Sequence, residues 1–290
     1  MIGYKAAIHP PTKQRALVIL EIPENGKNNL NRPGVYDSDY APYRCDGAKV
    51  ISVKDMETGE DIEGAISIFG HAGEKKILYM KDEVVYPDDY NKDDNVIYGA
   101  GIHFYKTEEP ARHIRMNKPN NGINKEWYDD GRLAYECFYK DGVLHGEYTY
   151  WFPNGTIEHR GYYDHGVKNG LFQTWFDNGN LKSQHHYVDD HLNGECIDYY
   201  YNGNMHKVSH YQMHKLNGVH NEWYYSGTPS CTANYKNGER HGAFRSYHGN
   251  GVPMEESYFM FGMEHGERKL YDDTGQLISN RCYRNGYICR

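Results

Sequence analysis

Histidine is the most prominent residue with metal-binding or acid–base chemistry in this 290-residue chain, which contains 17 of them. His206, His210 and His214 are spaced four residues apart, and His185, His186 and His220 are near them in the sequence. On a helix this spacing aligns side chains on one face, where they could bind a metal ion. In an extended strand the same spacing separates neighbours by ~13 Å. A metal site here therefore requires a helix.

Other candidates for catalysis are sparse. In the first 121 residues we single out His103 with Glu108 or Glu109, but no nucleophile has a fixed spacing to them, as acid–base catalysis would require. Gly99-Ala-Gly101 lacks the third glycine of a dinucleotide-binding loop and precedes a strand candidate, not a helix. We expect no catalytic residue, no cofactor, no metal site and no enzyme activity.

Charge, hydropathy and cysteine content indicate which partners and which cellular location to expect. The net charge of -8 is spread evenly along the chain, which argues against binding driven by charge to nucleic acid or anionic lipid. The longest apolar run, 16–20, is far shorter than the ~20 residues of a membrane helix, and no signal peptide is visible. The six cysteines have no Cys-x-x-Cys spacing and are predicted to be free thiols, although Cys282 and Cys289 could pair. We expect a cytoplasmic protein.

Residues 122–289 consist of seven repeats of 24 residues without an insertion or deletion. We number the positions of a repeat from its first glycine, so that Gly122 and Gly146 are at position 1. Position 10 is always glycine: Gly131, Gly155, Gly179, Gly203, Gly227, Gly251 and Gly275. Position 6 is always a large aromatic residue: Trp127, Trp151, Trp175, Tyr199, Trp223, Tyr247 and Tyr271.

Each repeat is predicted to form a β-hairpin. Asn-Gly and Asp-Gly pairs such as Asn154-Gly155 favour a type I′ turn, and a glycine every nine to fifteen residues leaves no room for helices. Strand geometry disfavours a metal site at His206, His210 and His214. His186 and His210 are instead expected to fill half-buried ring positions that resist protonation, so we expect the fold to weaken in acid.

The alternation of side chains predicts the two faces of the sheet. The position-6 aromatic residue is expected to pair across the hairpin with the aliphatic residue at position 12, and position 15 is expected on the opposite, solvent-facing side. The second turns at Asp190 and His214, and the strands at Pro229 and Pro253, are expected to be irregular. The rings at position 7 are candidate binding residues on the face opposite the position-6 row, with simple covering of the sheet as the alternative: Tyr128, Phe152, Phe176, Tyr200 and Tyr224.

The first 115 residues contain a different, β-rich module with a short helix at 108–114, followed by a linker at 116–121. Strands are expected near 16–22, 48–53, 62–69, 76–80 and 101–105. We therefore expect a small N-terminal α+β domain (1–115) and, at 122–290, an elongated single-layer antiparallel sheet of stacked hairpins. Such an array touches only neighbouring repeats.

The pattern Gly-x-x-x-x-Trp-Tyr-x-x-Gly, followed by Tyr-x-x-Gly and then x-x-His-Gly, resembles the variant form of MORN repeats. Residues 1–115, through Met1–Lys5, 16–23, 43–46, 83–87 and 101–106, resemble an uncharacterised domain found ahead of repeat arrays in amoebal giant viruses. These resemblances imply a viral, non-enzymatic scaffold that binds a protein partner or forms a homo-oligomer, in the host cytoplasm or inside the virion. The alternatives are enzyme or toxin-like activity in the N-terminal domain, antitoxin-like neutralisation of a partner, and membrane recruitment, which the negative charge disfavours.

Overall fold

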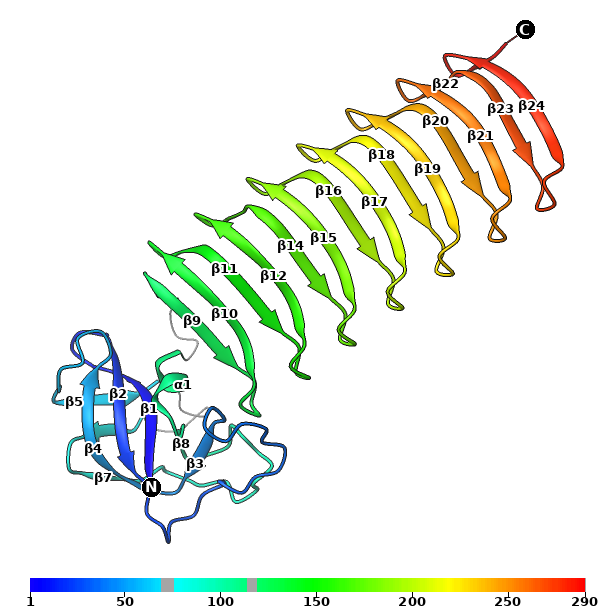
Figure 1. Ribbon diagram of the computed structural model, residues 1–290. Coiled ribbons are helices and arrows are strands. Elements are labelled where there is room, and N and C mark those ends of the chain that lie inside the picture. The colour runs from blue at the N-terminus through cyan, green and yellow to red at the C-terminus, as the bar shows by residue number, and fades with distance from the viewer. Residues whose placement is uncertain (69–75, 114–118, 290) are drawn as a thin grey trace. The chain divides into compact units, whose positions relative to one another are not determined.

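A computed structural model describes residues 1–68, 76–113 and 119–289 (Figure 1). The chain divides into two compact units, one made of Met1–Pro119 and Ile123–Glu136, the other of Asn120–Gly122 and Cys137–Arg290. The hairpin of repeat 1 therefore belongs largely to the first unit. Over the described residues, no helix has both the length and the apolar character needed to cross a bilayer.

The first unit is built on a six-stranded sheet with the order β6-β5-β1-β2-β4-β7 and a separate two-stranded sheet, β3-β8. One short helix, α1, follows β8. The bounds are β1 Ile2–Ile8, β2 Arg15–Glu21, β3 Tyr43–Cys45, β4 Ala48–Asp55, β5 Gly64–Ser67, β6 Leu78–Met80, β7 Val84–Val85, β8 Ile102–Phe104 and α1 Glu108–His113.

The two strands with the clearest apolar runs in the sequence form the core of this unit. Val18 and Leu20 of β2 and Val50 and Val53 of β4 are fully buried, so the apolar runs that predicted these strands do form the core. Strands β1 and β3 were not predicted, because β3 has only three residues and the seven residues of β1 do not alternate between polar and apolar. Three expected features fall outside the described residues: the end of a strand at Phe69, the end of the helix at Ile114, and residues 116–118 of the linker.

The repeat region is one elongated, open antiparallel sheet of 17 strands, in which consecutive strands are neighbours (Figure 1). The predicted fold class is confirmed. The short strands β13 and β22 are the first parts of strands that are continuous elsewhere in the array, because each pairs with the same neighbour as the strand that follows it. The short strand β25 pairs with β24 at the end of the array. The bounds are β9 Gly122–Trp127, β10 Leu133–Lys140, β11 Val143–Trp151, β12 Ile157–Asp164, β13 Val167–Lys168, β14 Gly170–Trp175, β15 Leu181–Val188, β16 His191–Tyr199, β17 Met205–Gln212, β18 Lys215–Trp223, β19 Pro229–Lys236, β20 Glu239–Tyr247, β21 Pro253–Met260, β22 Met263–Glu264, β23 Gly266–Tyr271, β24 Leu277–Arg284 and β25 Tyr287–Ile288.

The first turn of each repeat differs from the predicted type I′ turn. In repeat 2, Gly155 N donates to Phe152 O at 2.8 Å, and Gly155 has a φ of 87°, whereas Asn154 is not among the residues with positive φ. This is a three-residue loop that ends in one left-handed glycine. The positive φ at both central residues that a type I′ turn requires occurs instead in the second turn of each repeat, as in Asp141-Gly142, with φ of 51° and 77°.

The second turn stays regular where glycine is replaced, contrary to the expectation. Asp190 and His214 adopt φ of 64° and 65°. Their amides donate to the preceding repeat at 3.0 and 2.9 Å, as Gly142 N does to Asn120 O at 2.8 Å. The hydrogen bond between repeats holds these residues in a conformation that L-residues otherwise disfavour.

The strands that begin at proline are also regular, which corrects the second expectation of irregularity. Pro229 pairs with Trp223 and Pro253 pairs with Tyr247, in the same register as Ile157 with Trp151. Proline is tolerated because it is the first residue of its strand, where its missing N–H breaks no ladder of hydrogen bonds. These pairings also confirm that positions 6 and 12 face each other across the hairpin.

A β-bulge decides which side chains share a face. In repeat 2, Tyr150 pairs with His159 but Trp151 pairs with Ile157, so Glu158 is an extra residue in the second strand. The same shift occurs in repeats 3 to 7. An extra residue resets the alternation beyond it. Positions 12 and 15 therefore lie on one face.

Two contacts confirm this arrangement and correct the expected placement of position 15. The Arg160 guanidinium lies 5.8 Å from the centre of the Trp175 ring, and Tyr271 OH donates to the Glu256 carboxylate at 3.1 Å. We call the side with Trp175 the tryptophan face. The other, with His159, His185 and His220, is called the histidine face.

Candidate functional site

The position-7 rings of repeats 2 and 3 line a hollow in the array. Phe152 and Phe176 form it together with Trp175, His159 and Lys182, and its volume is about 610 Å³. Both phenylalanine rings are half-buried, and the Lys182 ammonium lies 5.7 Å from the centre of the Phe176 ring. The hollow is open to solvent and combines apolar surface with charge. It could accept an apolar or aromatic side chain of a partner.

The equivalent tyrosines in repeats 4 and 5 are tied to the next repeat. Tyr200 OH donates to the backbone oxygen of Trp223 at 2.8 Å, and Tyr224 OH donates to that of Tyr247 at 2.7 Å. Tyr200 also lies 4.4 Å, centre to centre, from the His206 ring. Phenylalanine has no hydroxyl, so Phe152 and Phe176 cannot form this bond. The hollow thus lies between two repeats whose position-7 residues have no hydroxyl to bond to the next repeat.

Repeat 1 is packed against the N-terminal domain within the first compact unit. The Trp127 ring stacks on Tyr40 with centres 5.3 Å apart, and the Lys125 ammonium lies 3.0 Å from Glu109. A Cβ at Gly131 would lie only 2.0 Å from the backbone oxygen of Asp37. Tyr128, the fifth candidate binding residue, belongs to this same packed hairpin and is half-buried.

The position-6 row is only half-buried, so it is not a closed core. All seven residues from Trp127 to Tyr271 have intermediate exposure. The position-10 glycines each have positive φ, from 85° at Gly179 to 91° at Gly131, which accounts for their invariance within the chain. These residues build the hairpins, while the exposed side of the rings remains available for contact.

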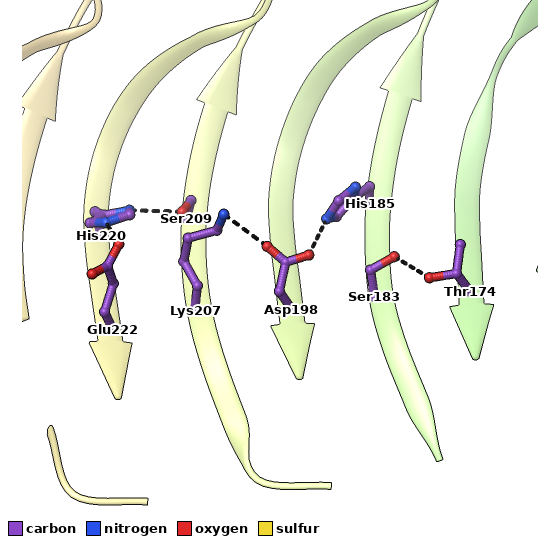
Figure 2. Close-up of polar contacts among 8 residues, drawn as sticks. All are labelled: Thr174, Ser183, His185, Asp198, Lys207, Ser209, His220 and Glu222. Carbon is purple, nitrogen blue, oxygen red and sulfur yellow. Dashed lines mark hydrogen bonds and ion pairs between the residues drawn. The ribbon is translucent and has the colours of Figure 1, made fainter. Parts of the chain in front are cut away.

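A row of polar contacts crosses repeats 3 to 5 on the histidine face (Figure 2). It begins with the hydroxyls of Thr174 and Ser183, 2.6 Å apart. The Asp198 carboxylate lies 2.8 Å from His185 Nε2 and 2.9 Å from Lys207 Nζ. This row could not be recognised from the sequence, because its members are at positions 3, 5, 14 and 16 and the residue type at each of these positions changes from one repeat to the next.

The Asp198 carboxylate is held ionised within this row. Burial alone would raise the pKa of Asp198, but the hydrogen bonds from His185 and Lys207 and the charge of Lys207 lower it to about 2. Burial would likewise lower the pKa of Lys207, but its bond to Asp198 raises it. The pair thus carries both charges at neutral pH within repeat 4, and the contact of His185 with Asp198 links it to repeat 3.

The row ends in an arrangement that resembles a nucleophile with its base. Ser209 Oγ lies 2.8 Å from His220 Nδ1, and His220 Nε2 lies 3.0 Å from the Glu222 carboxylate (Figure 2). Ser209 is 0% exposed, so a substrate carbonyl cannot reach its hydroxyl in this conformation. Nucleophilic catalysis needs that access as well as the hydrogen bond. The geometry supports a structural role, in which buried polar groups satisfy each other.

The structure places the histidines of the initial metal hypothesis in separate surroundings. His206 lies against the Tyr200 ring, His210 Nε2 lies 3.6 Å from the Glu195 carboxylate, and His214 Nδ1 accepts from Leu192 N at 3.2 Å. All three belong to strand and turn, as expected. His186 is exposed, which corrects the expectation that it fills a half-buried ring position, whereas His210 is half-buried as expected.

The acidic residues near His103 have other partners. Glu108 pairs with Arg112 within α1, and Glu109 pairs with Lys125 of repeat 1. His103 lies against the Tyr98 ring, with centres 6.2 Å apart. The candidate acid–base pairing of the N-terminal domain is therefore replaced by contacts that hold α1 and repeat 1 in place.

Comparison with known families agrees with this architecture. Six segments match the MORN repeat variant: 120–141, 144–165, 168–189, 192–213, 240–260 and 264–285. The protein thus carries an array of MORN repeat variants, a class whose members generally mediate contacts with proteins or membranes. Residues 1–111 match DUF5758, a family of unknown function. A search of curated proteins finds no match.

Proposed function

We propose that this protein is a non-enzymatic scaffold that binds a protein partner through its repeat array. The resemblance to proteins of amoebal giant viruses supports a viral role, in the cytoplasm of the infected cell or in the virion interior. We further propose that the chain functions as an N-terminal domain (1–115), a linker (116–121) and an array (122–290). The partner is a protein, and a second copy of the chain is one form that it can take.

The observation that carries this proposal is the hollow between repeats 2 and 3. Aromatic side chains provide a large contact area at a low cost in conformational entropy, because each has only two rotatable bonds. Phe152, Phe176 and Trp175 provide such area in one place, and Lys182 and Asp177 add charge at its border. A hydrogen bond between the turns of repeats 2 and 3, from Asn154 Nδ2 to Asp177 O at 2.6 Å, positions the backbone that carries these rings before a partner binds, which reduces the cost of binding.

The test uses the full chain, with the photo-reactive amino acid p-benzoyl-phenylalanine placed at the exposed Tyr201, whose ring lies 5.2 Å from that of Phe176 at the hollow. Cross-linking in cells and mass spectrometry then identify the partner. Binding of the purified partner is measured for the unmodified chain and for the double variant Phe152→Ala, Phe176→Ala. We expect the double variant to bind at least tenfold more weakly.

The control variant is Leu171→Ala, which removes an exposed side chain of repeat 3 at position 2, away from the hollow. It should bind the partner as the unmodified chain does. Equal affinity of the double variant and the control would contradict the assignment of the hollow. Flotation of the full chain with anionic vesicles would instead support membrane recruitment.

A further inference from the structure

Two histidines and one aspartate meet at the junction of repeats 1 and 2. His165 Nδ1 lies 2.6 Å and His145 Nδ1 lies 3.3 Å from the same Asp164 oxygen, Oδ1. One ligand atom from each of the three side chains lies within 4.8 Å of the others. The side chains are 24%, 46% and 64% exposed for His145, Asp164 and His165, so an ion can reach them from solvent.

The backbone holds these three residues in place. The second turn of repeat 2 is attached to the preceding strand, because Gly166 N donates to Leu144 O at 2.7 Å. His165 N also donates to His145 Nδ1, at 3.4 Å. The attachment recurs along the array, for example from Gly262 to Arg240 at 2.9 Å. The backbone that carries the three ligands is therefore preorganised by the fold.

Both ring nitrogens and the carboxylate can converge on one cation. Each Nδ1 has a single lone pair, so on binding a metal ion His145 would exchange its 3.4 Å contact with the His165 amide for the ion. Without a metal ion, a proton on either Nδ1 can bridge to Asp164 Oδ1, at 2.6 Å from His165 or 3.3 Å from His145. A metal ion would bind all three groups at once, whereas a single proton bridges only two of them.

The repeats provide an internal comparison for this site. His145 is the last residue of repeat 1, and Asp164 and His165 are at positions 19 and 20 of repeat 2, so every other junction has three equivalent residues. In the other junctions these positions carry at most two residue types that bind metals. The sets are Asn121, Lys140, Asp141; Asn169, Val188, Asp189; Asn193, Gln212, Met213; Asn217, Lys236, Asn237; His241, Met260, Phe261; and His265, Arg284, Asn285.

We propose that His145, Asp164 and His165 bind one divalent transition-metal ion of the Zn²⁺ type. Imidazole and carboxylate are ligands that such ions accept, and three protein ligands leave a position for water. Ligand atoms on a tetrahedral Zn²⁺ ion are separated by roughly 3.3 Å, given bonds of about 2.0 Å. The separation of His145 and Asp164 already has this value, and rotation of the exposed His165 ring adjusts the other distances. The ion would cross-link repeat 1, through His145, to repeat 2, through Asp164 and His165.

The test is titration of the full chain with ZnCl₂, followed by calorimetry and by the NMR signals of the histidine rings. Three variants each replace one ligand with the residue that another repeat has at that position: His145→Asn as in Asn169, Asp164→Lys as in Lys140, and His165→Asn as in Asn237. Because these residues fold normally elsewhere in the array, the variants should fold. We expect the unmodified chain to bind one Zn²⁺ ion that each variant binds at least tenfold more weakly.

The matched control is His241→Asn, which removes a histidine from the same backbone position in another junction. It should leave the binding of that ion unchanged. In the NMR titration of the unmodified chain, the signals of His145 and His165 should shift first. Equal Zn²⁺ affinity in the variants and the unmodified chain, or first shifts at other histidines, would show adventitious binding and overturn the site.

Discussion

At the scale of single residues, the packing between repeats 2 and 3 depends on a glycine that leaves room for an aromatic ring of the next repeat. Gly161 is buried, and the Phe172 ring of the next repeat lies directly over it. Phe172 is itself held edge-on between the rings of Tyr163 and Tyr187, at 5.3 and 5.2 Å. The contact between repeats 2 and 3 is therefore as sensitive to added volume as a closed core.

Gly161→Ala should destabilise the array. A Cβ at this position would lie 2.3 Å from the Phe172 ring, so the ring must move out of its place between two tyrosines. Overpacking of this kind costs ~1–3 kcal/mol in the free energy of unfolding. Urea unfolding at neutral pH measures the change. Phe172→Leu in the Gly161→Ala background should restore part of the loss, and its failure to do so would mean that the steric contact is not the cause.

Trp175→Ala tests the position-6 row. Because Trp175 is half-buried and carries Arg160 over its ring, we expect a loss of about 2 kcal/mol in the free energy of unfolding, less than for a fully buried tryptophan. Chemical denaturation measures it. A loss below ~0.5 kcal/mol would show that the row contributes little to stability and serves mainly as surface.

At the scale of elements, the last hairpin contains a pair of cysteines that its strands bring together. Cys289 N donates to Cys282 O at 2.8 Å, across β24 and β25. The two sulfur atoms lie 2.8 Å apart, and both side chains are exposed. The hydrogen bond between the thiols raises the pKa of Cys282, which favours the neutral thiol over the reactive thiolate.

We expect these two cysteines to form a disulfide with an added oxidant. Oxidised glutathione would accept two electrons and leave as two reduced glutathione molecules, while the protein loses two protons with its two electrons. Mass spectrometry should then show a loss of about 2 Da, in a peptide that joins Cys282 and Cys289. The variant Cys289→Ser is the control. Glutathione adducts that persist on Cys282 in the unmodified chain would contradict the expectation.

At the scale of the whole molecule, protonation couples to folding through a few half-buried groups in each compact unit. Burial lowers the pKa of His159, whose ring stacks between Tyr148 and Tyr150. Burial likewise lowers the pKa of His113, at the end of α1. The Asp198 carboxyl, with its pKa at about 2, is the corresponding acidic group in the array.

Stability should fall in acid in two stages. The two histidines fold in the neutral form, so their contribution is complete above their unfolded pKa of ~6.5 and is lost as the pH falls from there towards the lower folded value. The contribution of Asp198 is complete above ~4 and is lost as the pH approaches 2. Melting temperatures at pH 7.5, 5.5 and 3.5 measure both stages.

The control for the upper stage is His159→Tyr, which places at position 14 the residue that repeat 1 has there, Tyr135. It should reduce the difference in melting temperature between pH 7.5 and 5.5. An unchanged difference would assign the upper stage to other histidines.

The N-terminal domain should protect the first hairpin. Within the first compact unit, Tyr98 OH donates to the Asp129 carboxylate at 2.5 Å, and the amides of Tyr36 and Asp37 both donate to Asp130 O at 2.8 Å. Deletion of residues 1–115 would remove these partners and leave an unpaired strand edge at β9, which is a template for association. Light scattering should show oligomers of the truncated chain. A monodisperse array with unchanged stability would contradict this protective role.

The sequence by itself determined the features that lie within one repeat. The period of 24 residues, the two turns per repeat and the pairing of Trp151 with Ile157 all follow from local rules, because turn residues and strand alternation act over a few neighbours. The histidine spacing at 206–214 could likewise be assigned to strand without a structure. The position-7 rings were identified as a row in the same way.

Only the tertiary structure decided the features that depend on how successive repeats are aligned. The extra residue at Glu158 and its equivalents moves Arg160 to the face of Trp175, and no local pattern marks that bulge. The hollow at Phe152 and Phe176 and the cluster at His145 also join residues about 20 positions apart. Their distance depends on the register between repeats, which is the sum of many backbone hydrogen bonds and cannot be read from any one residue.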